Sequence, residues 1–323
     1  MNAQLDALRS FVARRPNGAA AAAHGGAQVV VVGSGKGGAG TSVVAALVAV
    51  AAAATGKRVL LVDADPHVGP QRYLFGIAPS PSIADLRAGV EPAAIAVPVS
   101  ATLTLVPGGP PVSAGATPAD PAEQRALLRR VATLYPEHEL VVIDGGSRLD
   151  AVSACLESAG LPARLLVVTD TDPIALAASY ALVKAARERT AAIAGGPVAA
   201  DVLVNRQDDE SGRLGFAQVA RACVEFLGAT VRHAGTLPED GSLALALRAG
   251  MPLQDAAAGS PAAVATQALV ERLLIDLTSD RTTGTTSFFD RPNVPGGTAP
   301  RRPTTSTYAP PFRASAVPSG AIR

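Results

Sequence analysis

One stretch of the sequence decides the fold, and it reads Gly33-Ser34-Gly35-Lys36-Gly37-Gly38-Ala39-Gly40-Thr41-Ser42. A run of apolar residues at 28–32 precedes it, and a helix is predicted over 42–55 directly after it. A strand, a glycine-rich loop and a helix in this order form a cradle in which backbone N–H groups bind phosphate. The sequence therefore predicts a phosphate site, whose binding residues are expected to be Gly35, Lys36, Gly37, Gly38, Ala39, Gly40, Thr41 and Ser42.

The loop departs from the common phosphate-binding motif at one position. That motif ends in Gly-Lys-[Ser/Thr], where the lysine reaches the β- and γ-phosphates and the hydroxyl binds Mg²⁺. Here Thr41 takes the place of the lysine, and a different lysine, Lys36, lies earlier in the loop. A loop that has lost one residue is the alternative, in which Thr41 itself would bind Mg²⁺. The sequence favours binding with weak hydrolysis, because a charge-assisted contact contributes about 1.5–3 kcal/mol.

Composition limits the class of protein. The chain has 323 residues, of which 48% are hydrophobic and only 3% aromatic, so Ala and Val must fill most of the core. A net charge of +1 gives no sign of a nucleic-acid or membrane surface. The two cysteines, Cys155 and Cys223, lack metal-ligand spacing, and the sequence has no recognisable signal peptide. These features predict a cytoplasmic protein with reduced thiols.

The chain divides into three zones. Residues 1–26 are expected to form a short helix and a linker, residues 27–276 alternate strand-like and helical segments, and residues 277–323 form a Pro-, Thr- and Arg-rich tail predicted to be disordered. Strands are predicted at 29–32, 59–62, 103–106, 140–143, 165–168, 202–204 and 231–235, and helices between them at, for example, 121–134, 173–189, 215–227 and 260–277. This alternation predicts an α/β fold, a single doubly wound domain with a mostly parallel sheet of about seven or eight strands flanked by helices.

Three aspartates follow apolar strands of the predicted sheet. Asp63 and Asp65 come after the strand at 59–62, and Asp144 follows the strand at 140–143. The carboxyl ends of parallel strands line the crevice in which such sheets bind ligands. Carboxylates placed there hold water on Mg²⁺ and orient an attacking water molecule. We therefore expect a metal site next to the glycine loop.

These motifs together resemble the MinD/ParA group of P-loop ATPases, whose deviant Walker A loop has the signature Lys-Gly-Gly-x-Gly-Lys-[Ser/Thr]. The likeness extends over about residues 27–276. The loop at 36–40, the segment at 63–66 and Asp144 stand at family-like positions. Further along the chain, the residues that resemble the adenine-side contacts of the family are Asn205, Pro238, Glu239 and Asp240.

The resemblance implies a P-loop NTPase that binds ATP or ADP with Mg²⁺ and forms an ATP-dependent homodimer. In such a dimer Lys36 would reach the phosphates of the partner, Asp63 would support Mg²⁺ through water, and Asp65 would position the attacking water. These three are the expected catalytic residues, and the expected metal-binding residues are Ser42, Asp63 and Asp144. A hydroxyl residue is common in the family after the second carboxylate, and Gly145 replaces it here.

Within this group the chain resembles the flagellar-number regulators of the FlhG (FleN, YlxH) type. In that subgroup an N-terminal helix with an Asp-Gln-Ala-x-x-Leu-Arg-like motif engages the GTPase FlhF, and residues 3–9 match it here at Gln4, Leu8 and Arg9. The resemblance implies an ATP-switched regulator of flagellar placement or number with an FlhF-like partner. It also implies a cytoplasmic protein that is recruited to the cell pole or the inner membrane face.

Two other functions remain open from the sequence. The chain also resembles BcsQ, CpaE and TadZ, polar localisation factors for cellulose or pilus machinery, and would then be a scaffold with a degenerate site. A ParA-like partitioning protein would bind DNA, but the near-neutral charge gives no support for this, and no specific nucleic acid is expected. No basic amphipathic helix follows Leu277, so membrane contact is expected to be weak or mediated by a partner.

Overall fold

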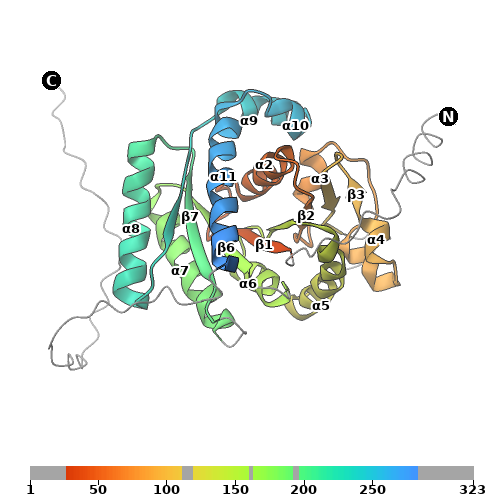
Figure 1. Cartoon of the computed structure of the whole chain (residues 1–323), viewed down its shortest axis with the longest axis horizontal. Helices are drawn as coiled ribbons and strands as arrows, with labels where there is room; N and C mark the ends of the chain where they lie inside the picture. The colour runs from red at the N-terminus through yellow and green to blue at the C-terminus, as the bar shows by residue number, and fades with distance from the viewer. Residues whose placement is uncertain (1–26, 111–118, 160–162, 192–195, 283–323) are drawn as a thin grey trace, which may run out of the picture.

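The computed structural model describes residues 27–110, 119–159, 163–191 and 196–282, and its centre is a single eight-stranded sheet (Figure 1). The strand order is β3-β4-β2-β5-β1-β6-β7-β8. Neighbouring strands are parallel except at one edge, where β3 and β4 are antiparallel. The strands are β1 (Gln28–Gly33), β2 (Val59–Asp63), β3 (Val97–Pro98), β4 (Leu103–Val106), β5 (Leu140–Asp144), β6 (Ala163–Thr169), β7 (Ala199–Asn205) and β8 (Arg232–Leu237).

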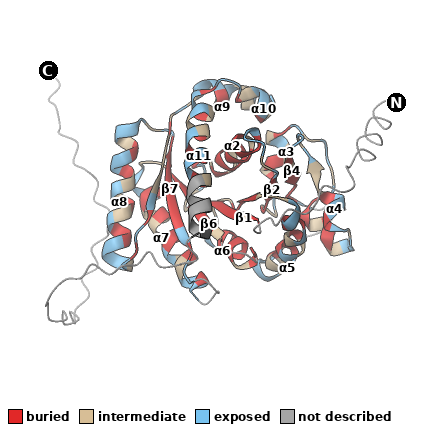
Figure 2. Ribbon diagram, in the orientation of Figure 1, coloured by how far each residue is buried: buried red, intermediate tan, exposed pale blue. Residues whose placement is uncertain are grey.

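The central strands form because their residues are apolar on both sides. Strands β2 and β5 are buried at every position, and β1 at every position after its first residue (Figure 2). Along β1, Val29 and Val31 pack into one hydrophobic cluster, while Val30 and Val32 pack into a second cluster on the opposite face. A strand that buries both faces needs helices on both sides, as parallel sheets generally have.

Helices cover the two faces of the sheet as two layers (Figure 1). One layer consists of α5 (Pro121–Val131), α6 (Leu149–Ser158), α7 (Pro173–Thr190) and α8 (Asp209–Leu227). The other consists of α2 (Thr41–Ala54), α9 (Gly241–Arg248), α10 (Leu253–Ala256) and α11 (Pro261–Thr282). Short helical segments complete the described chain, namely α3 (Pro70–Leu74), η1 (Ile83–Ala88), α4 (Pro92–Ile95) and η2 (Ala132–Glu137).

The position of β1 places a crevice at one edge of the sheet. Strand β1 lies between β5 and β6, so the chain winds outward in opposite directions on its two sides. In doubly wound sheets this reversal opens a crevice at the carboxyl ends of the strands, where ligands bind. The glycine loop leaves β1 at this point. Asp63 ends β2, Asp144 ends β5 and Asn205 ends β7, so all three lie at the same edge.

The predicted fold class is confirmed, because the chain forms one mostly parallel sheet with helices on both faces. All seven predicted strands are present. The edge strand β3 was missed, because two residues, one of them a proline, give no periodic signal. Helix α8 begins at Asp209, earlier than the predicted residue 215, since Asp208 caps it through the Ser211 N–H.

The two ends of the chain can be compared with their predictions only in part, because the structure describes residues from 27 to 282. Helix α11 continues to Thr282, past the predicted helix end at Leu277, so its last residues belong to the zone expected to be a tail. The expected N-terminal helix at 1–26 and the remainder of the predicted tail, 283–323, lie outside the described residues. Within the described part of the chain, no helix combines the length and apolar character needed to cross a membrane.

Candidate functional site

The glycine loop joins β1 to α2 and leaves the first N–H groups of α2 free to bind an anion. Gly38 and Gly40 have φ angles of 83° and 88°, in the left-handed region that favours glycine. Gly40 gives α2 no side-chain cap, and the first turn of the helix carries no acidic residue. The first N–H groups of α2 are therefore left to an external partner, and the helix dipole favours one with negative charge.

Two glycines let the loop pack closely against its neighbours. A Cβ atom at Gly35 would lie 2.2 Å from the backbone carbonyl of Ala178 in α7, which leaves no room for a side chain. A Cβ atom at Gly40 would lie 2.5 Å from Nδ2 of Asn205, whose side chain itself donates to the Ala39 carbonyl at 2.8 Å. The loop is thus docked against α7 on one side and the end of β7 on the other.

Thr41 turns its side chain into the protein beneath the loop. It is only 7% exposed, and its hydroxyl donates to the Ser34 hydroxyl at 2.7 Å. Ser34 in turn donates to the Lys36 carbonyl at 3.0 Å. This chain of hydroxyls supports the loop from within but contributes no positive charge at the position where the common motif has lysine.

Ser42 lies on the other side of the helix start, beside the strand-end carboxylates. Its side chain forms a hydrogen bond with Asp144. Asp144 is paired in register with Asp63 across the adjacent strands β5 and β2. The structure thus brings the side chain of Ser42, rather than that of Thr41, to Asp144, which agrees with a loop of full length in which Thr41 replaces the lysine.

Gln71 connects these two carboxylates and was not expected from the sequence. Its backbone N–H donates to Asp63 at 2.9 Å, and its side-chain Nε2 donates to Asp144 at 2.8 Å and to the Ser42 carbonyl at 2.9 Å. Its Oε1 is buried and has no hydrogen-bond partner among the described residues. We call Ser42, Asp63, Gln71 and Asp144 the carboxylate side of the loop.

The two carboxylates are buried so deeply that their charge is disfavoured. Burial, and then the charge of Asp144, raise the pKa of Asp63 well above its ordinary value. Burial also raises the pKa of Asp144, against the hydrogen bonds from Gln71 and Ser42. A divalent cation would relieve this cost, and the oxygen atoms present are of the kind that Mg²⁺ prefers. In the described part of the chain no three His, Cys, Asp or Glu side chains could hold a metal alone, so phosphate oxygens or water would have to complete the shell.

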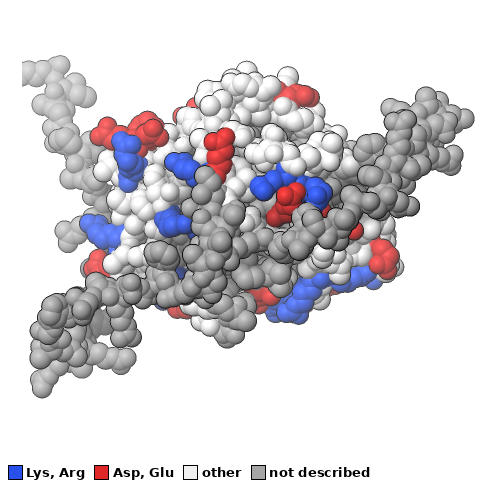
Figure 3. All heavy atoms as spheres, in the orientation of Figure 1, with Lys and Arg blue, Asp and Glu red and all other residues white. Residues whose placement is uncertain are grey.

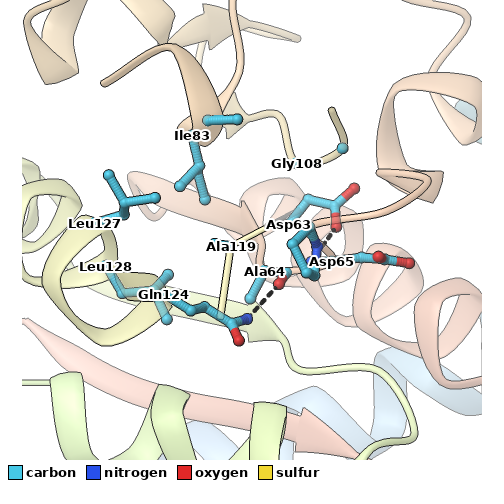
Figure 4. Close-up of a pocket in the computed structure, with 12 residues that line it drawn as sticks. Asp63, Ala64, Asp65, Ile83, Gly108, Ala119, Gln124, Leu127 and Leu128 are labelled. Carbon is cyan, nitrogen blue, oxygen red and sulfur yellow. Dashed lines mark hydrogen bonds between the residues drawn. The ribbon is translucent and has the colours of Figure 1, made fainter. Parts of the chain in front are cut away.

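Asp65 is placed in the loop after β2 and orders that loop. Its carboxylate accepts the His67 N–H at 2.7 Å and the Val68 N–H at 3.3 Å. A small, mostly apolar cavity lies beside this turn, with Ile83, Leu127 and Leu128 in its wall, as Figure 4 shows. Gln124 donates across it to the Ala64 carbonyl at 2.7 Å (Figure 4). The turn after β2 is therefore held from both sides. Asp65 adjoins the carboxylate side, because its backbone N–H donates to Asp63 at 3.1 Å, while its own carboxylate accepts hydrogen bonds from the turn.

Two cations lie against the opposite side of the loop. Lys36 Nζ is 3.5 Å from Oδ1 of Asp172, the residue that caps α7. Arg206 donates to the Gly38 carbonyl at 2.7 Å and lies 3.8 Å from Asp170. Asn205, expected to contact adenine, is 9% exposed and donates to the loop. We call Lys36, Asp170, Asp172, Asn205 and Arg206 the cation side.

The expected adenine-side segment follows β8 and begins α9. Asp240 caps this helix by accepting the Leu243 N–H at 2.9 Å, and it also accepts the Ala262 N–H at 3.2 Å. Burial raises the pKa of Asp240, but hydrogen bonds from Leu243 and Ser242 outweigh it and bring the pKa to about 2. Among the described residues no hydrogen bond joins Pro238, Glu239 or Asp240 to the glycine loop. The segment begins beside the cation side, because Leu237, which directly precedes it, is paired in register with Asn205.

Sequence reasoning missed four residues of the site, and two of them carried a signal. Asp172 precedes Pro173, and an aspartate before a proline commonly begins a helix. Because this helix follows the predicted strand at 165–168, the pattern would have placed the Asp172 carboxylate at the same sheet edge as the loop. Arg206 follows Asn205 directly. Asp170 and Gln71 gave no local signal. The partner of Gln71, Asp144, is 73 residues away, so only the folded chain reveals their contact.

Comparison with known proteins agrees with this geometry. The family model for the CobQ/CobB/MinD/ParA nucleotide binding domain (CbiA) matches residues 30–253. The antiactivator FleN of Pseudomonas aeruginosa is 27% identical over 226 residues, which cover 68% of this chain and 76% of FleN.

Solved structures give the same fold. MinD from Pyrococcus horikoshii, solved with Mg-ADP, has a TM-score of 0.61 and 18% identity over 81% of this chain and 99% of MinD. The MinC:MinD complex from Aquifex aeolicus has a TM-score of 0.60 and 20% identity, over 77% of this chain and 96% of the matched chain. Because the family model spans more than half of the sequence, the chain belongs to the CobQ/CobB/MinD/ParA family of nucleotide-binding domains.

Proposed function

We propose that this protein is an ATP-switched dimeric spatial regulator that controls flagellar placement or number and hydrolyses ATP slowly. The observation that carries the proposal is the contrast around the start of α2. Ser42 lies hydrogen-bonded to Asp144 on the carboxylate side, whereas Thr41 is neutral, buried and committed to Ser34. Binding groups for a nucleotide and a metal are thus present, while the cation that acts within the subunit in the common motif is not.

The ligands of this proposal are ATP or ADP with Mg²⁺. MinD of P. horikoshii was solved with Mg-ADP, which supports the same ligand class here. The N–H groups at Gly37, Gly38, Gly40 and the start of α2 would bind phosphate, and Ser42, Asp63 and Asp144 would hold the metal. When bound, Mg²⁺ would neutralise phosphate charge and the two buried carboxylates. Asp65 would orient water from the turn after β2.

The replacement of lysine by Thr41 sets the expected rate. Phosphoryl transfer depends on preorganised positive charge around the transferred group, so a missing cation affects the transition state more than the bound nucleotide. Loss of one charge-assisted contact costs about 1.5–3 kcal/mol, which corresponds to roughly 10–100-fold. We therefore expect measurable ATP binding and slow turnover.

The variant Thr41→Lys tests this proposal. ATP affinity and turnover should both rise, by about tenfold or more, because the new ammonium reaches the phosphates. Thr133→Lys, which adds the same charge at an exposed position on η2, is the matched control and should change neither quantity. ATP titration and steady-state phosphate release are the measurements. Wild-type turnover equal to that of Thr41→Lys would refute the role given to Thr41.

Dimerisation is the second part of the proposal. In the isolated chain Lys36 is ion-paired with Asp172 of its own subunit, at 3.5 Å and at half-exposed positions. We expect ATP to draw Lys36 from Asp172 towards a partner subunit, so light scattering should show a dimer with ATP and a monomer without it. Lys36→Ala should remain monomeric under both conditions. A nucleotide-independent dimer would instead favour the scaffold function of BcsQ, CpaE and TadZ type.

The flagellar role is supported by the similarity to the antiactivator FleN. An FlhF-like GTPase would be the partner, bound through residues 3–9, which lie outside the described residues. In this proposal the protein is cytoplasmic and is recruited to the cell pole or inner membrane face. Deletion of the gene should change the number or position of flagella, whereas altered cellulose or pilus assembly would indicate a scaffold.

A partitioning function has less support on the visible surface. In Figure 3 basic and acidic side chains are interspersed over the described part of the face shown, rather than gathered into a basic stripe. A DNA-binding surface needs such a stripe to displace counterions from the phosphates. A salt-dependent DNA mobility shift would restore the ParA-like alternative.

A further inference from the structure

Arg206 has an unusual backbone conformation for an arginine. Its φ angle is 59°, and it is the one non-glycine residue with positive φ in the described part of the chain. For a residue with a Cβ atom this region costs about 1–2 kcal/mol. Such a conformation persists where the surrounding structure imposes it, and it is concentrated at functional sites. The strain is therefore a reason to ask what the side chain does.

The strained backbone aims the guanidinium of Arg206 at the glycine loop. Its Nη2 donates to the Gly38 carbonyl at 2.7 Å and lies 3.8 Å from a carboxylate oxygen of Asp170. The preceding Asn205 holds the next loop carbonyl, that of Ala39, at 2.8 Å. The side chain of Arg206 is 45% exposed, so it has room to turn from the loop carbonyl towards a bound anion.

The loop lacks a positive charge at the position of Thr41, and Arg206 is placed to supply one. Thr41 is neutral and faces inward. Lys36 is paired with Asp172, at the other end of the segment that carries Asp170. Both acidic residues belong to the connection between β6 and α7, so this connection holds both cations on the cation side of the loop. Of these two cations, Arg206 lies at the loop carbonyl, beside the N–H groups expected to bind phosphate.

From this geometry we propose that Arg206 is a binding residue for the phosphate chain of the nucleotide, and that it supplies within the subunit the charge that Thr41 lacks. The inference rests on the proposed nucleotide function. In the nucleotide-free chain Gly38 and Asp170 hold the guanidinium next to the loop. A polyphosphate, with several negative charges, outcompetes one carbonyl and one partly exposed carboxylate for it.

The variant Arg206→Gly tests the proposal without disturbing the fold. Glycine adopts a positive φ without strain, so this change removes the guanidinium and leaves the backbone at least as stable. ATP affinity should fall about tenfold or more, ADP affinity less, and AMP affinity less than about twofold, because the effect follows phosphate charge. The difference in ATP affinity between the wild type and Arg206→Gly should shrink as the salt concentration is raised, because salt screens the charge of the guanidinium. Arg206→Lys should recover part of the loss.

Controls separate this role from loop support and from general charge. Arg221→Ala, which removes an exposed arginine of α8, should leave all three affinities unchanged. In a Thr41→Lys background, Arg206→Gly should cost less than it does in the wild type, since the new lysine supplies the charge. Equal losses for ATP, ADP and AMP, independent of salt, would reduce Arg206 to a support of the loop and overturn the proposal.

Failure of this inference is distinct from failure of the proposed function. If the wild type binds ATP and Arg206→Gly binds it equally well, the role of Arg206 is refuted while nucleotide binding stands. If the wild type binds no nucleotide in calorimetric titration with Mg-ATP or Mg-ADP, the proposed function falls and the inference falls with it. Thermal unfolding of each variant shows that the comparison is made between folded proteins.

Discussion

The carboxylate side and the cation side of the glycine loop are built in different ways. On the carboxylate side, Gln71 donates to buried carboxylates at 2.8 and 2.9 Å. On the cation side, the ion pairs measure 3.5 and 3.8 Å and involve partly exposed side chains. Buried polar groups joined by short hydrogen bonds are held in one geometry, whereas exposed ion pairs contribute little and exchange partners easily. The difference indicates a rigid half and an adjustable half around one loop.

The largest effect should come from breaking the contact that docks the loop on the cation side. Gly35→Ala places a Cβ atom 2.2 Å from the Ala178 carbonyl, so the loop or α7 must move. Overpacking of this kind costs about 1–3 kcal/mol, and the backbone contact places this site at the upper end. Thermal or denaturant unfolding should show that loss, and ADP affinity should fall with it.

A second glycine in the same loop provides the matched control. At Gly37 the nearest atom to an added Cβ would be the Ser147 hydroxyl at 3.7 Å, an ordinary contact. Gly37→Ala should therefore leave stability within about 0.5 kcal/mol of the wild type. Equal destabilisation by the two variants would mean that the loop is not docked on α7 as described.

A moderate effect should follow from removing the link within the carboxylate side. Gln71→Leu deletes the donor to Asp144 and leaves that carboxylate less satisfied, which costs about 1–2 kcal/mol of stability. Mg-ADP should narrow the difference in melting temperature, because the cation replaces the lost donor. Tyr73→Leu, an exposed position on the same helix, should have no effect. If Mg-ADP does not narrow the difference in melting temperature between the wild type and Gln71→Leu, this result would argue against a metal on the carboxylate side.

The smallest effect concerns pH. Burial raises the pKa of both Asp63 and Asp144, so at low pH protons occupy groups that Mg²⁺ needs. Proton release accompanies metal binding and is easier at higher pH, so Mg-ADP affinity should rise several-fold from about pH 6 to pH 8. Asp63→Asn should reduce the rise of Mg-ADP affinity with pH. Both proteins are measured in the same buffers, so the titration of ADP itself affects them equally and cancels in the comparison. A slope unchanged by Asp63→Asn would remove these carboxylates from the metal site.

Much of the fold could be predicted because its determinants are local. Short apolar runs rich in Val, Leu and Ile, such as 59–62 and 140–143, are typical of strands buried on both faces, and in a parallel sheet the aspartates after them meet at one edge. The pairing of Asp63 with Asp144 follows from strand order. The edge strand Val97–Pro98 escaped prediction, since its pairing with β4 depends on the tertiary position of two residues.

The sequence by itself determined the glycine loop, the strand-end carboxylates and the replacement of lysine by Thr41. These are properties of residue type and spacing, which fix backbone freedom and charge before the chain folds. Only the tertiary structure decided that Thr41 points inward, that Gln71 joins two carboxylates, and that Arg206 reaches the loop. The contacts of Gln71 and Arg206 join residues 73 and 168 positions apart in the chain, whereas that of Thr41 lies within the loop. Their geometry depends on packing, which no local pattern encodes.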